Sequence, residues 1–150
     1  MRLVDAILGF FKRLRKEDVV FGSMLYMGDR LKYWEGKAIF TPASSKIEVF
    51  VDGSAEDDME QQHDFFRQLL QEWPMLREEI GKLLLSHARE PGRGGPIASP
   101  WEEFRVSSAS IPKGSLDRSE WEISLARLSD PNHLWTVQMK GREPQGLEVG

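Results

Sequence analysis

The chain of 150 residues contains no cysteine. This absence excludes a disulfide framework, a zinc or iron–sulfur site with cysteine ligands, and a thiol nucleophile. The sequence also lacks any apolar run near the roughly 18 residues that a membrane-spanning helix requires. Hydrophobic residues make up 40% of the chain and charged residues 29%, a balance typical of a globular protein. A chain of this length is expected to contain one folded domain.

Sequence patterns that carry catalysis are missing as well. The histidines His63, His87 and His133 lie far apart and form no pair at metal-ligand spacing. His63 is interpreted as an exposed helix residue. No serine stands in a Gly-x-Ser-x-Gly motif, and Gly81-Lys82 follows no phosphate-binding loop. The sequence therefore favours a non-enzymatic protein with no metal ion and no cofactor.

Charge is distributed unevenly along the chain. The net charge is −4, which disfavours a protein that binds nucleic acid. Residues 1–16 carry five lysines and arginines against one aspartate, so this segment has a charge of +4 and the remaining chain −8. Such asymmetry indicates a basic element with a separate role, attached to an acidic body.

The basic segment has the apolar spacing of an amphipathic helix, predicted over residues 1–17, ahead of a single domain at 18–150. Phe10 and Phe11 lie on its apolar side, whereas Lys12, Arg13 and Lys16 lie opposite. Three interpretations are open: the helix packs on the body, lies on a membrane surface, or docks in a groove of a partner protein. The protein is expected in the cytoplasm and, in the membrane interpretation, at the periphery of the inner membrane.

An acidic stretch follows in the body. Residues 47–66 contain seven acids and no lysine or arginine. One interpretation is a binding face that attracts a basic protein partner. The other is a solvated helix start, where acids are stabilised by the helix dipole. The candidate interface comprises Asp52, Glu56, Asp57, Asp58 and Glu60 in this stretch.

Hydrophobic periodicity predicts an α+β fold with helices between two groups of strands. Strands are predicted at 19–27, 33–40 and 46–51 as an antiparallel meander, with Gly36 marking a bulge or a close approach. Two central helices are predicted at 56–72 and 74–88, separated at Pro74 because proline disfavours a helix interior. Three further antiparallel strands are predicted at 104–110, 121–128 and 134–140.

Five tryptophans give a further signal. Trp73, Trp121 and Trp135 lie in apolar registers and are expected in the core, but Trp101 follows a segment rich in proline and glycine and precedes two glutamates. We therefore expect Trp101 to be partly exposed and add it to the candidate protein interface.

Several short motifs resemble a bacterial family catalogued as a domain of unknown function. They are Phe21-Gly22, Trp34-Glu35-Gly36, the strand at 47–51 ending in Asp52, a helical pair, and tryptophan-rich strands near the C-terminus. The resemblance spans about residues 19–150 and leaves the basic helix outside. Some relatives are recorded near polymorphic toxin genes, so the resemblance implies an immunity protein. Together with the acidic stretch, this implication makes a basic toxin domain the expected partner. The resemblance implies no catalytic residues.

Two functional hypotheses therefore follow from the sequence, ahead of a third, an enzyme without a recognisable motif. The first is a non-enzymatic protein-interaction domain that binds and neutralises a toxin. The alternative is a peripheral membrane-associated domain that residues 1–16 tether to a membrane surface.

Overall fold

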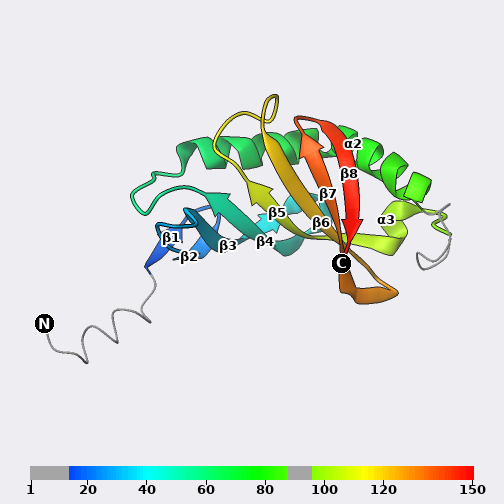
Figure 1. The fold of residues 1–150 in the computed structure, drawn as a ribbon, viewed down its shortest axis with the longest axis horizontal. Coiled ribbons are helices and arrows are strands. Elements are labelled where there is room, and N and C mark those ends of the chain that lie inside the picture. The colour runs from blue at the N-terminus through cyan, green and yellow to red at the C-terminus, as the bar shows by residue number, and fades with distance from the viewer. Residues whose placement is uncertain (1–13, 88–95) are drawn as a thin grey trace, which may run out of the picture.

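The computed structural model describes residues 14–87 and 96–150 and shows a mixed α+β fold (Figure 1). One eight-stranded sheet carries its strands in chain order. The first four strands form an antiparallel meander: β1 (Arg15–Asp18), β2 (Gly22–Tyr26), β3 (Tyr33–Phe40) and β4 (Ser45–Asp52). The last four form a second meander: β5 (Phe104–Ile111), β6 (Glu120–Arg127), β7 (Asp130–Lys140) and β8 (Glu143–Val149).

The two meanders are joined through the long helix α2 (Glu60–His87). Strands β4 and β5 are neighbours and run parallel, and a parallel pair requires a long crossover connection. Helix α2 supplies it and runs across one face of the sheet (Figure 1). A 3-10 turn, η1 (Thr41–Ala43), links β3 to β4, and the short helix α3 (Pro100–Glu103) leads directly into β5.

The core lies between α2 and the sheet. In β4, Ile47, Val49 and Val51 are buried while Lys46 and Glu48 are exposed, as the alternating pattern predicts. The buried residues of α2 recur at helical spacing and include Phe65, Phe66, Leu69, Trp73, Leu76, Ile80 and Leu84. The expected α+β class is thus confirmed.

The prediction of two central helices is wrong, because α2 continues through Pro74 as one helix of 28 residues. Proline removes one hydrogen bond and costs a helix interior about 3 kcal/mol. Burial contributes about 1.5–3 kcal/mol for each large apolar side chain, and Trp73 and Leu76 are both buried beside an exposed Pro74. Packing on both sides of the proline therefore outweighs the local preference.

The strand predictions need three corrections. The predicted strand at 19–27 begins at Gly22, because residues 19–21 form a turn between β1 and β2. Strand β8 was not predicted, since Pro144 and Gly146 interrupt its pattern. It is an edge strand, where proline is tolerated, and the β7–β8 register shifts beside Pro144. The antiparallel prediction also missed the β4–β5 pair.

The predicted N-terminal helix at 1–17 lies largely outside the described residues, and so do Phe10, Phe11, Lys12 and Arg13. Its last residues are not helical, because β1 begins at Arg15. The strand pairs with β2, and the Tyr26 N–H donates to the Leu14 carbonyl at 2.8 Å. Pairing with an existing strand satisfies backbone groups that an isolated helix end leaves open.

Gly36 marks a close backbone approach, as the sequence predicted. A Cβ atom at this position would lie 2.5 Å from the carbonyl oxygen of Phe21. The same carbonyl accepts a hydrogen bond from the Lys37 N–H at 3.0 Å. Only glycine lets the β1–β2 turn sit this close to β3.

Candidate protein-interaction surface

The predicted acidic face occupies the connection between β4 and α2. We call residues 52–60 the acidic loop; Asp52 ends β4 and Glu60 begins α2. Asp52, Glu56, Asp58 and Glu60 are exposed as residues, although partial burial of the Asp52 carboxyl group raises its pKa above the ordinary value. The fifth acid, Asp57, is half-buried as a residue, and only 6% of its side chain is accessible.

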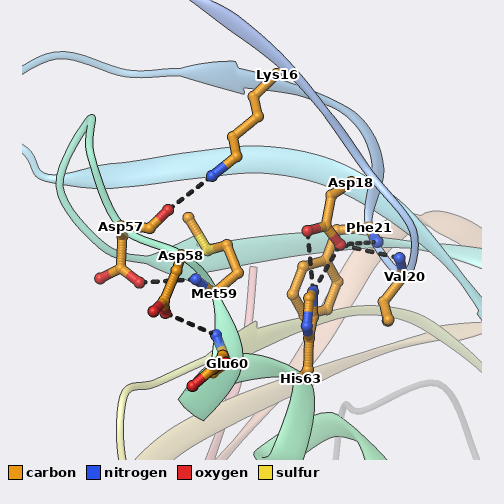
Figure 2. Close-up of polar contacts among 9 residues, drawn as sticks. All are labelled: Lys16, Asp18, Val20, Phe21, Asp57, Asp58, Met59, Glu60 and His63. Atoms are coloured by element: carbon orange, nitrogen blue, oxygen red, sulfur yellow. Dashed lines mark hydrogen bonds and ion pairs between the residues drawn. The ribbon is translucent and has the colours of Figure 1, made fainter.

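Asp57 holds the loop to other parts of the fold (Figure 2). Its carboxylate accepts from the Met59 N–H at 2.9 Å and pairs with Lys113 Nζ at 2.7 Å. Its carbonyl oxygen accepts from Lys16 Nζ, also at 2.7 Å. Burial alone would raise the pKa of Asp57, but hydrogen bonds from Lys113, Met59 and Gln62 outweigh burial and hold the pKa below its ordinary value. Asp57 is therefore a charged structural anchor in the loop.

Asp58 stabilises the beginning of α2. Its carboxylate accepts from the Glu60 N–H at 3.1 Å, which satisfies a donor that the first helical turn leaves open (Figure 2). The contacts of Asp57 and Asp58 thus agree with the interpretation of the acidic stretch as a helix start. Within residues 14–87 and 96–150, Asp52, Glu56, Asp58 and Glu60 form no ion pair.

Lys16 links the two regions that the sequence singled out separately. It belongs to the predicted basic helix but projects from β1 onto the acidic loop (Figure 2). Forty-one positions separate Lys16 from Asp57, so no local pattern could reveal this contact. Lys16 is consequently engaged with the body of the protein.

Sequence reasoning missed the pair formed by Asp18 and His63. His63 is not the exposed helix residue that was expected: its Nε2 donates to Asp18 Oδ2 at 2.8 Å, and only 19% of its side chain is accessible. Its ring also packs on Phe21 at a centroid distance of 5.3 Å (Figure 2). Among the described residues, only the backbone N–H groups of Val20 and Phe21 form further hydrogen bonds with the side chains of this pair. None of these partners is an acid, a histidine or a nucleophile that could complete a catalytic group.

Asp18 also closes the turn between β1 and β2. Its carboxylate accepts from the N–H groups of Val20 and Phe21, both at 2.9 Å. Burial alone would raise the pKa of Asp18, but the hydrogen bonds from Phe21, His63 and Val20 lower it below the ordinary value. The pair is thus a packed structural contact between β1 and α2.

Trp101 lies in α3, away from the acidic loop, and is half-buried as predicted. Its indole Nε1 donates to the carbonyl of Arg77 in α2 at 3.0 Å. The Arg77 guanidinium stands 5.5 Å from the indole centroid, within cation–π range. Trp101 and the acidic loop therefore belong to two separate surfaces.

The part of the chain that the structure describes contains no group of three or more histidine, aspartate or glutamate side chains placed to hold a metal ion. No described helix is long and apolar enough to cross a membrane. Comparison of the chain with family models, curated proteins and solved structures found no match.

Proposed function

We propose that this protein is a non-enzymatic interaction domain that binds a basic protein through the acidic loop. In this proposal it acts as a bacterial immunity protein, and the partner is a basic toxin domain. The observation that carries the proposal is the combination of exposed, unpaired acids with a loop whose backbone is fixed at its centre. Asp57 provides that fixation from inside the loop.

The acidic loop keeps a negative charge after its internal contacts are counted. Among the residues that the structure describes, its five acids face two lysines, Lys16 and Lys113, which leaves −3. A surface of one sign accelerates the encounter with an oppositely charged protein. Because the loop is already ordered, binding requires less loss of conformational entropy than a mobile loop would require.

The first test reverses the charge of Asp52 and Glu56, two acids whose side chains make no hydrogen bond to the described residues. We expect the variant Asp52→Lys/Glu56→Lys to fold normally but to associate with its partner about tenfold more slowly at low salt. The partner is isolated with the full-length protein from the source cells and eluted by salt. Association and dissociation rates are then measured by surface plasmon resonance.

A matched control reverses two exposed acids on the edge strand β8, Glu143→Lys/Glu148→Lys. This variant has the same change in net charge, so it should associate at nearly the wild-type rate. Equal slowing of both variants would indicate a non-specific effect of net charge and would contradict the proposed surface. In cells, co-expression with the captured protein should restore growth if that protein is a toxin.

The membrane hypothesis is the second candidate, favoured by two exposed leucines. Leu14 and Leu31 are 51% and 58% exposed, at the end of the sheet where residues 1–13 join β1. The acidic loop lies at the same end, since the Gly53 N–H donates to the Lys32 carbonyl at 3.0 Å. Its acids would repel anionic lipids, so we rank the protein partner first.

Deletion of residues 1–13 separates the two candidates. It leaves β1 and the contact between Lys16 and Asp57 intact, so we expect the melting temperature to change little. We further expect the full-length protein and the deletion variant to behave alike in flotation with anionic liposomes. Flotation of the full-length protein that is lost on deletion would favour the membrane tether. A strongly lowered melting temperature would instead show that residues 1–13 pack on the core.

A further inference from the structure

The sheet is split between β4 and β5. These strands pair only where Glu48–Val51 face Ser108–Ile111, although both strands begin several residues earlier. Residues 45–47 of β4 and 104–107 of β5 therefore do not pair with each other. Because the strands are parallel, the split opens toward their beginnings, where η1 and α3 lie.

A cavity of about 320 Å³ lies beside this opening, lined by residues of η1, α2, α3 and the start of β5. Trp73 of α2 is buried beneath the sheet, and the aromatic rings around it are in edge contact: Phe40 at 5.0 Å and Trp101 at 5.4 Å. Ala43 of η1 lines the cavity, and so does Leu128, whose side chain is half exposed. A volume near 300 Å³ is at the small end of ligand pockets and fits one large side chain.

The rim of the cavity is positively charged. Arg77 from α2 and Arg105 from β5 line it, and both are exposed. Neither arginine forms an ion pair with a described residue. Among the described residues that line the cavity, Glu102 is the one acid, which leaves an excess of one positive charge. A group that enters the cavity is thus favoured if it carries a negative charge.

We call the rings of Phe40, Trp73 and Trp101 the aromatic wall, and contacts within the protein already hold Trp101 in place. The hydrogen bond from Trp101 Nε1 to the Arg77 carbonyl sets the plane of the indole. Gly81 provides the necessary space in α2, since a Cβ atom there would lie 3.2 Å from the same nitrogen. A preformed wall lowers the entropy that binding must remove.

We propose that the split between β4 and β5 binds an extended peptide segment that inserts one large apolar side chain beside an acidic residue. The apolar side chain packs among Phe40, Trp73 and Trp101, and the acid contacts Arg77 or Arg105. The unpaired edge of β5 over residues 104–107 offers backbone hydrogen bonds to the peptide. The site goes beyond the proposed function: Arg77 lies 17 residues along α2 from Glu60, about 25 Å from the acidic loop.

The test uses capped pentapeptides as probes. One carries a central phenylalanine between two aspartates, the second replaces the aspartates with lysines, and the third replaces the phenylalanine with serine. Binding to the full-length protein is followed by the indole N–H signals in two-dimensional NMR, with the Trp101 signal identified by its loss in Trp101→Phe. We expect the first peptide to shift the Trp101 signal saturably and to bind at least about tenfold more tightly than either of the others.

Two surface variants and one control complete the design. Ala43→Trp fills the cavity from the exposed turn η1 and should weaken the first peptide at least about tenfold. Arg105→Glu should reverse the preference between the aspartate and lysine peptides. Arg118→Glu changes an exposed arginine outside the lining and should leave both affinities unchanged.

Each outcome decides the proposal. Equal binding of all three peptides, an unmoved Trp101 signal, or binding that survives Ala43→Trp in a folded protein would overturn it. Folding of each variant is checked by its thermal unfolding curve. The result does not depend on the acidic loop, because Asp52→Lys/Glu56→Lys should bind the first peptide as the wild type does. A failed toxin interaction and a failed peptide site are therefore distinguishable.

Discussion

Replacing Asp18 with alanine should lower the free energy of unfolding by about 2–4 kcal/mol at neutral pH. The substitution leaves three donors without their acceptor: the N–H groups of Val20 and Phe21, and Nε2 of His63. Only 6% of the Asp18 side chain is accessible, so water replaces these hydrogen bonds incompletely. Urea denaturation followed by tryptophan fluorescence measures the loss.

The chain contains a matched control for this prediction. Asp130 pairs with His133 at 2.9 Å, but both side chains are more than half exposed. Asp130→Ala should therefore change the free energy of unfolding by at most about 1 kcal/mol. If both variants lose the same stability, burial of the Asp18 contacts contributes nothing and the prediction is wrong.

The contribution of Asp18 should also depend on pH. Its pKa is lowered in the folded protein, so its stabilising effect is fully present above the ordinary carboxyl pKa of about 3.9. The effect is lost as the pH falls through the lower pKa of the folded state. The difference in stability between wild type and Asp18→Ala should thus shrink as the pH falls below about 4. A difference that grows as the pH falls below about 4 would contradict this sign.

Replacing Pro74 with alanine should raise the free energy of unfolding by about 1–3 kcal/mol. Pro74 is exposed within α2, where its ring removes the hydrogen bond to the Leu70 carbonyl, so alanine restores a backbone donor at a position that buries little area. Thermal and urea denaturation measure the gain. As a control, Gln71→Ala at a nearby exposed position should change stability by no more than about 0.5 kcal/mol.

The opposite result for Pro74→Ala would also be informative. A loss of stability would show that the backbone geometry set by Pro74 is needed to fit Trp73 and Leu76 onto the sheet. In that case the proline would be a requirement of the tertiary fold. The helix content measured by circular dichroism distinguishes a repacked helix from a lost one.

Local sequence patterns reveal some residues of the candidate surfaces but not the contacts between residues far apart in the chain. The exposed acids at Asp52 and Glu56 and the half-buried Trp101 were visible in the sequence, because each lies beside a turn signal or a proline. The contact of Lys16 with Asp57 and that of Asp18 with His63 join residues 41 and 45 positions apart. Such pairs depend on which strand packs beside which helix, so spacing along the chain carries no information about them.

By itself, the sequence determined the α+β class and the buried faces of its clearest elements. The alternation of Ile47, Val49 and Val51 defines a strand with one buried face, because successive side chains of a strand point to opposite sides. The tertiary structure decided that α2 passes unbroken through Pro74, that Arg15–Asp18 form a strand, and that β4 and β5 pair in parallel and then diverge. In each of these cases, the free energy gained by burial and by backbone pairing with distant residues exceeds the local conformational preference. That gain arises only when the sheet and the helix are assembled, so the local sequence does not reveal it.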